Sequence, residues 1–163
     1  MEVNVDEDIK MLVVTHKEAP MPSDTALYIP MLVGPNKNQL QFHHAYRDDE
    51  GVNIAEKNPN YCELTAMYWA WKNLDAKYVG ITHYRRLFMD LKDKHLPVQE
   101  ETLAKLFEEV DVILPKKRNY YIENTWSHYK HNHNIADLKM TKEIIAEKYP
   151  SYIPFFEETM THT

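Results

Sequence analysis

Residues 58–86 read NPNYCELTAMYWAWKNLDAKYVGITHYRR, and this stretch predicts a helix followed closely by a buried strand. Asn58 is a favourable N-cap, and Pro59 suits the first helical position, where its missing N–H would have no partner. Apolar side chains recur at helical spacing and predict one inward face, made of Leu64, Met67, Tyr68, Trp71 and Leu74. Residues 78–82 then predict a strand that ends just before His83-Tyr84-Arg85-Arg86. A helix and a strand in this order are typical of half a βαβ unit.

Further strands and helices are predicted on both sides of this stretch. The β-branched, apolar run 10–15 predicts a first buried strand, and residues 28–33 a short element between proline-rich loops. Residues 111–114 predict another strand, stopped by Pro115. Helices are predicted over 101–110, 137–149 and, after a cap at Ser151, up to Met160. Strands that alternate with helices predict an α/β fold with a mostly parallel sheet flanked by helices.

The length and composition fit one domain. With 163 residues, we expect a single α/β domain over 10–163 and a disordered or tag-like N-terminus over 1–9. The net charge of −6 argues against nucleic-acid binding, which needs a basic face. Cys62 is the only cysteine, which fits a reducing compartment, and no apolar run is long enough to span a membrane. We therefore expect a soluble, cytoplasmic protein, with peripheral association at the inner face of the membrane left open.

Glycine-dependent nucleotide motifs do not occur in this sequence. There are three glycines, and neither GxGxxG nor GxxxxGK[ST] is present. Both motifs need glycine so that the backbone can approach phosphates. A dinucleotide fold with that fingerprint and a P-loop kinase are therefore not expected.

Polar residues follow three of the predicted strands, and they predict an anion site. These residues are Thr15-His16-Lys17, His83-Tyr84-Arg85-Arg86 and Lys116-Lys117-Arg118. Parallel strands would bring them to one edge of the sheet, where arginine and lysine suit a diphosphate. Two alternatives stay open: residues 116–118 form a solvated turn, or Arg85 and Arg86 pair with Glu63 or Asp90.

The first turns of the long predicted helix offer a second polar surface. Asn58, Asn60 and Glu63 lie there, where free N–H groups and the helix dipole favour an anion or a polar sugar. Glu63 could equally complete a helix cap.

The histidines and acidic residues give weak support for a metal. His128, His131 and His133 are closely spaced, but without matching cysteines this spacing does not specify zinc. No Asp-x-Asp pair follows an apolar strand, so a divalent metal is not supported. Aromatic residues near Trp126 fit a core better than a stacking site. We expect no metal and no cofactor.

Several ordered blocks resemble one bacterial family, the capsular and exopolysaccharide biosynthesis proteins long filed as a domain of unknown function. The blocks are Val14–Lys17, Asn53–Ala66, Trp69–Asn73, Tyr78–Arg86, Asp111–Arg118 and Ser127–Tyr129. The resemblance runs from about Met11 to the end of the chain. It implies a glycosyltransferase with a GT-A-like, Rossmann-like nucleotide-binding domain, with the galactofuranosyl-transferring kind as one candidate. It also implies that His83-Tyr84-Arg85-Arg86 takes the place of a metal-binding Asp-x-Asp, so that arginine neutralises the diphosphate.

The resemblance also implies partners and residue roles. The donor would be a UDP-sugar and the acceptor a saccharide or lipid-linked saccharide. We expect Glu63 and His83 to be catalytic, and the nucleotide sugar to be bound by Thr15, His16, Lys17, Asn60, Tyr84, Arg85, Arg86, Lys117 and His128. Family members usually continue past the position of Thr163, so we expect a C-terminally truncated chain, whose exposed apolar surface would favour homo-oligomers. The other hypothesis is a non-catalytic module that binds a nucleotide or a partner protein.

Overall fold

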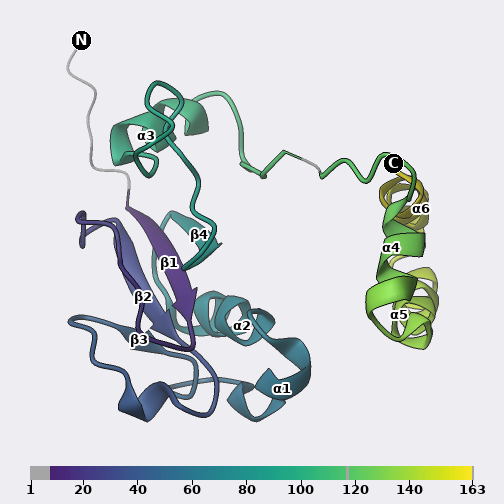
Figure 1. The fold of residues 1–163 in the computed structure, drawn as a ribbon, viewed down its shortest axis with the longest axis horizontal. Coiled ribbons are helices and arrows are strands. Elements are labelled where there is room, and N and C mark those ends of the chain that lie inside the picture. The colour runs from purple at the N-terminus through teal and green to yellow at the C-terminus, as the bar shows by residue number, and fades with distance from the viewer. Residues whose placement is uncertain (1–7, 117, 163) are drawn as a thin grey trace. The chain divides into compact units, whose positions relative to one another are not determined.

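The computed structural model describes residues 8–116 and 118–162, which separate into two compact units (Figure 1). Residues up to Ile113 form the first unit, and residues from Leu114 onward form the second. The predicted single domain over 10–163 stays a prediction, and most of the predicted tag-like N-terminus (residues 1–7) lies outside the described residues.

The first unit is built on a four-stranded parallel sheet with the order β3-β2-β1-β4 (Figure 1). The strands are β1 (Ile9–Thr15), β2 (Tyr28–Leu32), β3 (Tyr46–Arg47) and β4 (Tyr78–His83). The α/β class and the parallel sheet with flanking helices are therefore confirmed. The short β3 was not predicted, because two residues in a polar segment give no alternating apolar pattern.

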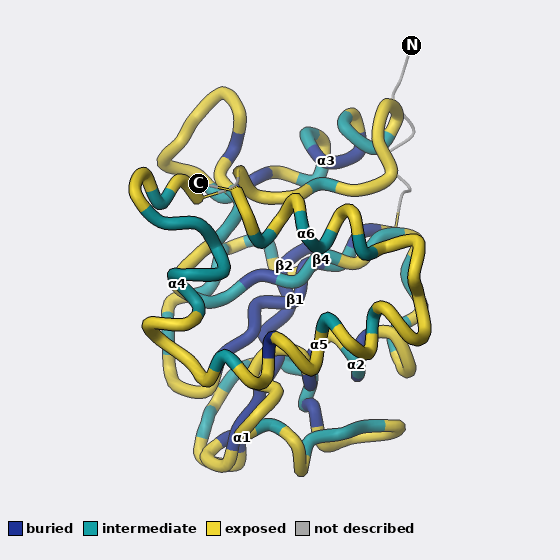
Figure 2. Tube along the Cα trace, turned by 90° about the vertical axis from the view of Figure 1, so that its right-hand side faces the viewer, coloured by how far each residue is buried: buried dark blue, intermediate teal, exposed yellow. Residues whose placement is uncertain are grey.

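Side chains of β1 alternate between two cores, one on each face of the sheet. Ile9, Met11 and Val13 pack with α3 (Glu100–Phe107). Leu12 and Val14 pack instead with α2 (Leu64–Asn73). This period of two is what a strand covered on both faces requires. In Figure 2, β1 lies in the buried centre of this unit.

The predicted long helix from Asn58 is broken in two. A 3₁₀ turn (Ala55–Lys57) leads into the single-turn α1 (Asn58–Tyr61), and α2 starts only at Leu64. At the break, Cys62 has φ 46°, a left-handed conformation that a continuous helix does not allow. The Asn58 side chain donates to the carbonyl of Cys62 at 3.0 Å and so supports the break. The predicted cap at Asn58 is therefore wrong. This residue lies inside α1, and its side chain stabilises the break between α1 and α2 instead of capping a helix.

Most of the predicted inward face of α2 is also wrong, although Leu74, just past the end of the helix, packs against the core. Leu64, Met67 and Trp71 are half or more exposed, and the buried residues are Thr65, Ala66, Trp69 and Ala70. Two alanines let the helix backbone approach the sheet closely, and Trp69 stays inward because its indole N–H donates to the carbonyl of Glu50 at 2.9 Å. The helical spacing was predicted correctly. A different face of α2 packs against the sheet, because it carries the small alanines and the hydrogen-bonded Trp69.

The predicted strand at 111–114 does not form. Residues 111–116 belong to no strand, and Val112 and Leu114 are mainly exposed. Within the described residues, β4 is the edge of the sheet on that side, and the boundary between the units falls after Ile113. An apolar run without a neighbouring strand has no partner for its backbone hydrogen bonds.

The second unit is helical. It contains α4 (Thr125–Asn132), α5 (Ile135–Lys148), a 3₁₀ turn (Pro150–Tyr152) and α6 (Ile153–Thr161). α4 was not predicted, although Asn124 and Ser127 form a reciprocal capping box at its start. Ser151 lies in the 3₁₀ turn and does not cap α6. Within the residues described here, no helix has the length and apolar character needed to cross a membrane.

Candidate functional site

The carboxyl ends of three strands border one open pocket of about 370 Å³. The sheet register pairs Thr15 with Leu32 and Val14 with His83, so β1, β2 and β4 end close together. Residues just past these ends, together with the α1–α2 break, line the pocket: His16, Val33, Gly34, Pro35, Asn36, Asn58, Cys62, Glu63, His83 and Arg85. Ligands of open α/β sheets bind at this edge, and the volume suits a small molecule.

The break between α1 and α2 brings Glu63 to His83. Glu63 Oε1 lies 3.7 Å from His83 Nε2. The other ring nitrogen, Nδ1, accepts a hydrogen bond from the backbone N–H of Arg85 at 3.2 Å. Because Nδ1 must offer its lone pair, the neutral ring carries its proton on Nε2, on the side of Glu63. The two residues predicted to be catalytic therefore line the same pocket and face one another.

The surroundings of His83 favour its neutral form. Burial lowers the pKa of His83 below its ordinary value. Glu63 acts in the opposite direction, whereas the positive charge of Arg85 lowers the pKa further. At neutral pH the imidazole can therefore donate a hydrogen bond through Nε2 without adding a charge, and the Glu63 side chain beside it is half exposed.

Tyr84 organises the cationic side chains around the pocket. Its ring meets His16 edge-on, with the two centroids 5.6 Å apart. Lys17 Nζ and the Arg85 guanidinium carbon each lie 5.4 Å from the same ring centroid. Cation–π contacts of this kind hold a charged side chain without neutralising it. Tyr84 thus orients the positive groups near the strand ends.

Arg85 and Arg86 differ in their relation to the pocket. Arg85 lines it, and Arg86 does not. Across residues 8–116 and 118–162, neither guanidinium lies within ion-pair distance of a carboxylate, so the alternative of pairing with Glu63 or Asp90 is not found. Asp90 instead accepts from the hydroxyl of Thr102 at 2.9 Å and from the N–H of Lys92 at 2.8 Å. An exposed guanidinium without a carboxylate partner is available to a ligand anion.

Other predicted binding residues do not line this pocket. Thr15 is buried, and its hydroxyl donates to the carbonyl of Lys17 at 2.5 Å. Asn60 is exposed on α1 and does not line the pocket. Lys117 lies outside the described residues. Because the strand at 111–114 is absent, the predicted meeting of residues 116–118 with the other two strand ends loses its structural basis.

His128 belongs to the second unit. Its ring stacks on Tyr120 with centroids 4.3 Å apart, and its Nδ1 lies 3.3 Å from Glu123. Glu123 also pairs with His131 at 2.6 Å. In the described part of the chain, no group of three or more histidine, cysteine or acidic side chains is arranged to hold a metal.

Several lining residues were not singled out from the sequence. Gly34, Pro35 and Asn36 follow β2, and Gly34 has φ 82°, a backbone conformation that suits glycine. The available signal was a glycine directly after the apolar run 28–33. Cys62 was missed because no residue type in its neighbourhood marks a break in the helix.

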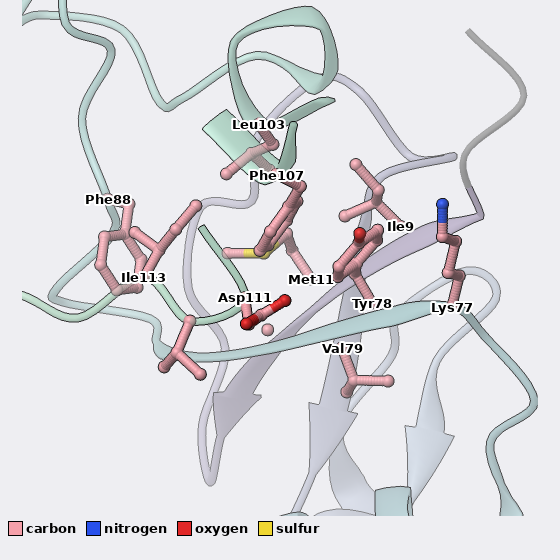
Figure 3. Close-up of a pocket in the computed structure, with 12 residues that line it drawn as sticks. Ile9, Met11, Lys77, Tyr78, Val79, Phe88, Leu103, Phe107, Asp111 and Ile113 are labelled. Atoms are coloured by element: carbon pink, nitrogen blue, oxygen red, sulfur yellow. The ribbon is translucent and has the colours of Figure 1, made fainter. Parts of the chain in front are cut away.

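A second cavity of about 290 Å³ lies at the other end of the same strands (Figure 3). The first residues of β1 and β4 line it together with α3 and the segment that follows α3. Tyr78 and Phe107 stack there with centroids 3.9 Å apart, and Leu103 is buried beside them. Asp111 is the acidic side chain on its wall. The surroundings are otherwise mainly apolar, so this cavity belongs to the core between the sheet and α3.

Comparisons with known proteins agree with this fold. Residues 10–163 match the family described as Domain of unknown function (DUF4422). In solved structures, the chain is similar to the WbbM bifunctional glycosyltransferase in its apo form, with a TM-score of 0.73 and 27% sequence identity. The match covers 96% of this chain and 32% of that one, so the chain spans less than half of that protein's length. No curated protein sequence matches. The fold is therefore glycosyltransferase-like.

Proposed function

We propose that this chain, which belongs to the family Domain of unknown function (DUF4422), is the nucleotide-sugar-binding portion of a glycosyltransferase. The observation that carries the proposal is the pocket at the strand ends, where Arg85 stands without a carboxylate partner beside the pair Glu63 and His83. The similarity to a glycosyltransferase structure supports the same reaction class. The donor is a UDP-sugar, with galactofuranose as the candidate sugar, and the product is a surface polysaccharide.

In this proposal, the cations of the pocket bind the diphosphate. Arg85 contacts it directly, and Lys17 and Arg86 add positive potential from nearby. As the bond between the anomeric carbon and the diphosphate breaks, negative charge grows on the leaving oxygen. A fixed guanidinium stabilises that charge in the place where a metal ion would otherwise act. The reaction is therefore proposed to be metal-independent.

Glu63 and His83 are placed to act on the acceptor. The acceptor hydroxyl attacks the anomeric carbon, the carbon–oxygen bond to the diphosphate breaks, and the hydroxyl proton passes to a base. Glu63 is half exposed and can take that proton, and the neutral ring of His83, with Nε2 3.7 Å from the carboxylate, adds no competing charge beside it. Whether attack retains or inverts the configuration depends on the face that the acceptor approaches.

Titration calorimetry tests the proposal directly. UDP and UDP-sugars should bind the purified chain with the same affinity in the presence and absence of EDTA. If none of these nucleotides binds, the proposal is contradicted. Loss of binding on addition of EDTA would remove only its metal-independent part.

A second candidate is a module that binds a nucleotide sugar without turnover. It is favoured by the 32% share of the similar glycosyltransferase that this chain spans. UDP binding without sugar transfer or donor hydrolysis would favour this candidate. Transfer of sugar by the chain alone would contradict it.

A further inference from the structure

A buried charged network lies beneath the pocket. Lys37, in a 3₁₀ turn (Lys37–Gln39), places Nζ 2.7 Å from Asp48 Oδ1. The hydroxyl of Thr65, on α2, lies 2.7 Å from the other oxygen of the same carboxylate. Asp48 and Thr65 have exposed fractions of 0%, so neither has water as a partner. A buried carboxylate needs such donors, and their arrangement is correspondingly rigid.

The charges of this network determine where its protons lie. Asp48 pairs with the Lys37 ammonium and can only accept hydrogen bonds. The Thr65 hydroxyl lies 2.7 Å from this carboxylate and 3.0 Å from the carbonyl of Cys62, and it donates its single proton to the charged and nearer acceptor, Asp48. The hydroxyl of Thr65 must then accept from Asn58, whose Nδ2 lies 3.0 Å from it. The carbonyl of Cys62 can only accept, and it also lies 3.0 Å from Nδ2. Two acceptors therefore fix the amide of Asn58 with its nitrogen toward the network.

The opposite end of the Asn58 amide is its oxygen, Oδ1. Asn58 lines the pocket, and in the described part of the chain no hydrogen bond to Oδ1 is found. Gly34 lies beside this oxygen, since a Cβ at Gly34 would be 3.6 Å from it. The network thus presents an oriented carbonyl oxygen to the pocket. Such an oxygen cannot approach a phosphate oxygen, because both are acceptors.

We propose that Asn58 is a specificity-determining residue, whose Oδ1 accepts a hydrogen bond from a hydroxyl or N–H of the nucleoside part of the ligand. Thr65, Asp48 and Lys37 are positioning residues that keep the amide in this orientation. The inference rests on the proposed nucleotide binding. It divides the pocket into a side around Arg85 that binds the diphosphate and a side around Asn58 that binds hydrogen-bond donors.

Calorimetry with two probes, UDP and pyrophosphate, tests the role of Asn58 in the full chain. Loss of one hydrogen bond should weaken UDP binding by Asn58→Ala about 3- to 10-fold. Pyrophosphate has no hydroxyl or N–H for Oδ1, so its affinity should not change. Unchanged UDP affinity, or an equal loss for both probes, would overturn the inference. If the unmodified chain bound pyrophosphate but not UDP, both the proposed function and this inference would fail.

The positioning role is tested by Thr65→Val with Thr65→Ser as its matched control. Serine keeps the hydroxyl and should keep the UDP affinity, whereas valine should weaken UDP binding and spare pyrophosphate. The double variant Asn58→Ala/Thr65→Val should bind UDP no more weakly than Asn58→Ala alone, because Thr65 acts through Asn58. Additive losses would contradict the positioning role. If Thr65→Val does not fold, Thr65→Ala with the same two probes takes its place.

Discussion

The pocket at the carboxyl ends and the cavity near the amino ends of β1 and β4 are built by the same strands but differ in their side chains. The pocket is lined by polar groups that keep free bonding capacity, such as Arg85 and the Asn58 oxygen. The cavity is lined mainly by apolar groups packed on one another, such as Tyr78 and Phe107 (Figure 3). We conclude that substitutions in the pocket should change binding, whereas substitutions around the cavity should change stability.

The largest expected effect is on stability, at the cavity. Leu103→Ala should lower the free energy of unfolding by about 3 kcal/mol, because it removes a buried side chain beside an existing void. Urea denaturation measures this change, and the UDP affinity should stay the same. Val112→Ala is the control, since Val112 lines the same cavity but is 67% exposed. An equal loss in the two variants would contradict the assignment of the cavity to the core.

The next largest effect is on binding, at the pocket. Arg85→Ala should weaken UDP binding by about 2 kcal/mol, the typical contribution of a hydrogen bond to a charged group. The melting temperature should not change, because the Arg85 side chain is exposed. Arg86→Ala is the matched control and should weaken binding less, because Arg86 does not line the pocket. Equal losses of UDP affinity would show that the pocket does not distinguish the two arginines.

A smaller stability effect is expected where β1 and β4 approach each other beside the cavity. A Cβ at Gly80 would lie 2.1 Å from Met11 Sδ, so Met11 must move aside. The flexible Met11 side chain can use the neighbouring cavity, and Gly80→Ala should therefore cost only about 1 kcal/mol of unfolding free energy. The cost should fall when Met11→Ala is also present, which a double-mutant cycle of urea titrations measures. An unchanged cost would mean that the Met11 contact is not its cause.

The smallest effect is a shift in the pKa of His83. In the folded chain this pKa should lie below the ordinary value of 6.5. Arg85→Ala should raise it, since a positive charge is removed, and Glu63→Gln should lower it further. NMR titration of the imidazole measures all three values.

The lowered pKa of His83 also makes the stability of the fold depend on pH. As the pH falls, His83 takes up a proton at a higher pH in the unfolded chain than in the folded chain. The stabilising contribution of neutral His83 to the free energy of unfolding is therefore fully present above pH 6.5. That contribution is lost as the pH falls from 6.5 through the lower folded pKa. A rise in pKa on Glu63→Gln would contradict the geometry of the pair.

Part of the site could be predicted from the sequence. The strands β1 and β4 are apolar runs bounded by polar residues, so their ends, and with them His16, His83 and Arg85, could be located. Asn58 was predicted both to cap a helix and to offer a polar surface to an anion or a sugar, but its role at the α1–α2 break was not predicted. Nothing in the local sequence indicates that the Asn58 amide would bind Thr65 and the carbonyl of Cys62.

The sequence by itself determined the α/β class, the two strands that frame the pocket and the excess of positive groups at their ends. These features follow from local hydrophobic patterning, which a single sequence records directly. Only the tertiary structure decided which stripe of α2 faces the sheet, where the helix breaks at Cys62, and that residues 111–114 form no strand. The inward face of α2 depends on partners outside the helix, such as the carbonyl of Glu50 for Trp69 and the carboxylate of Asp48 for Thr65. Local propensity contributes less free energy than such buried packing and hydrogen bonds, so the distant contacts prevail.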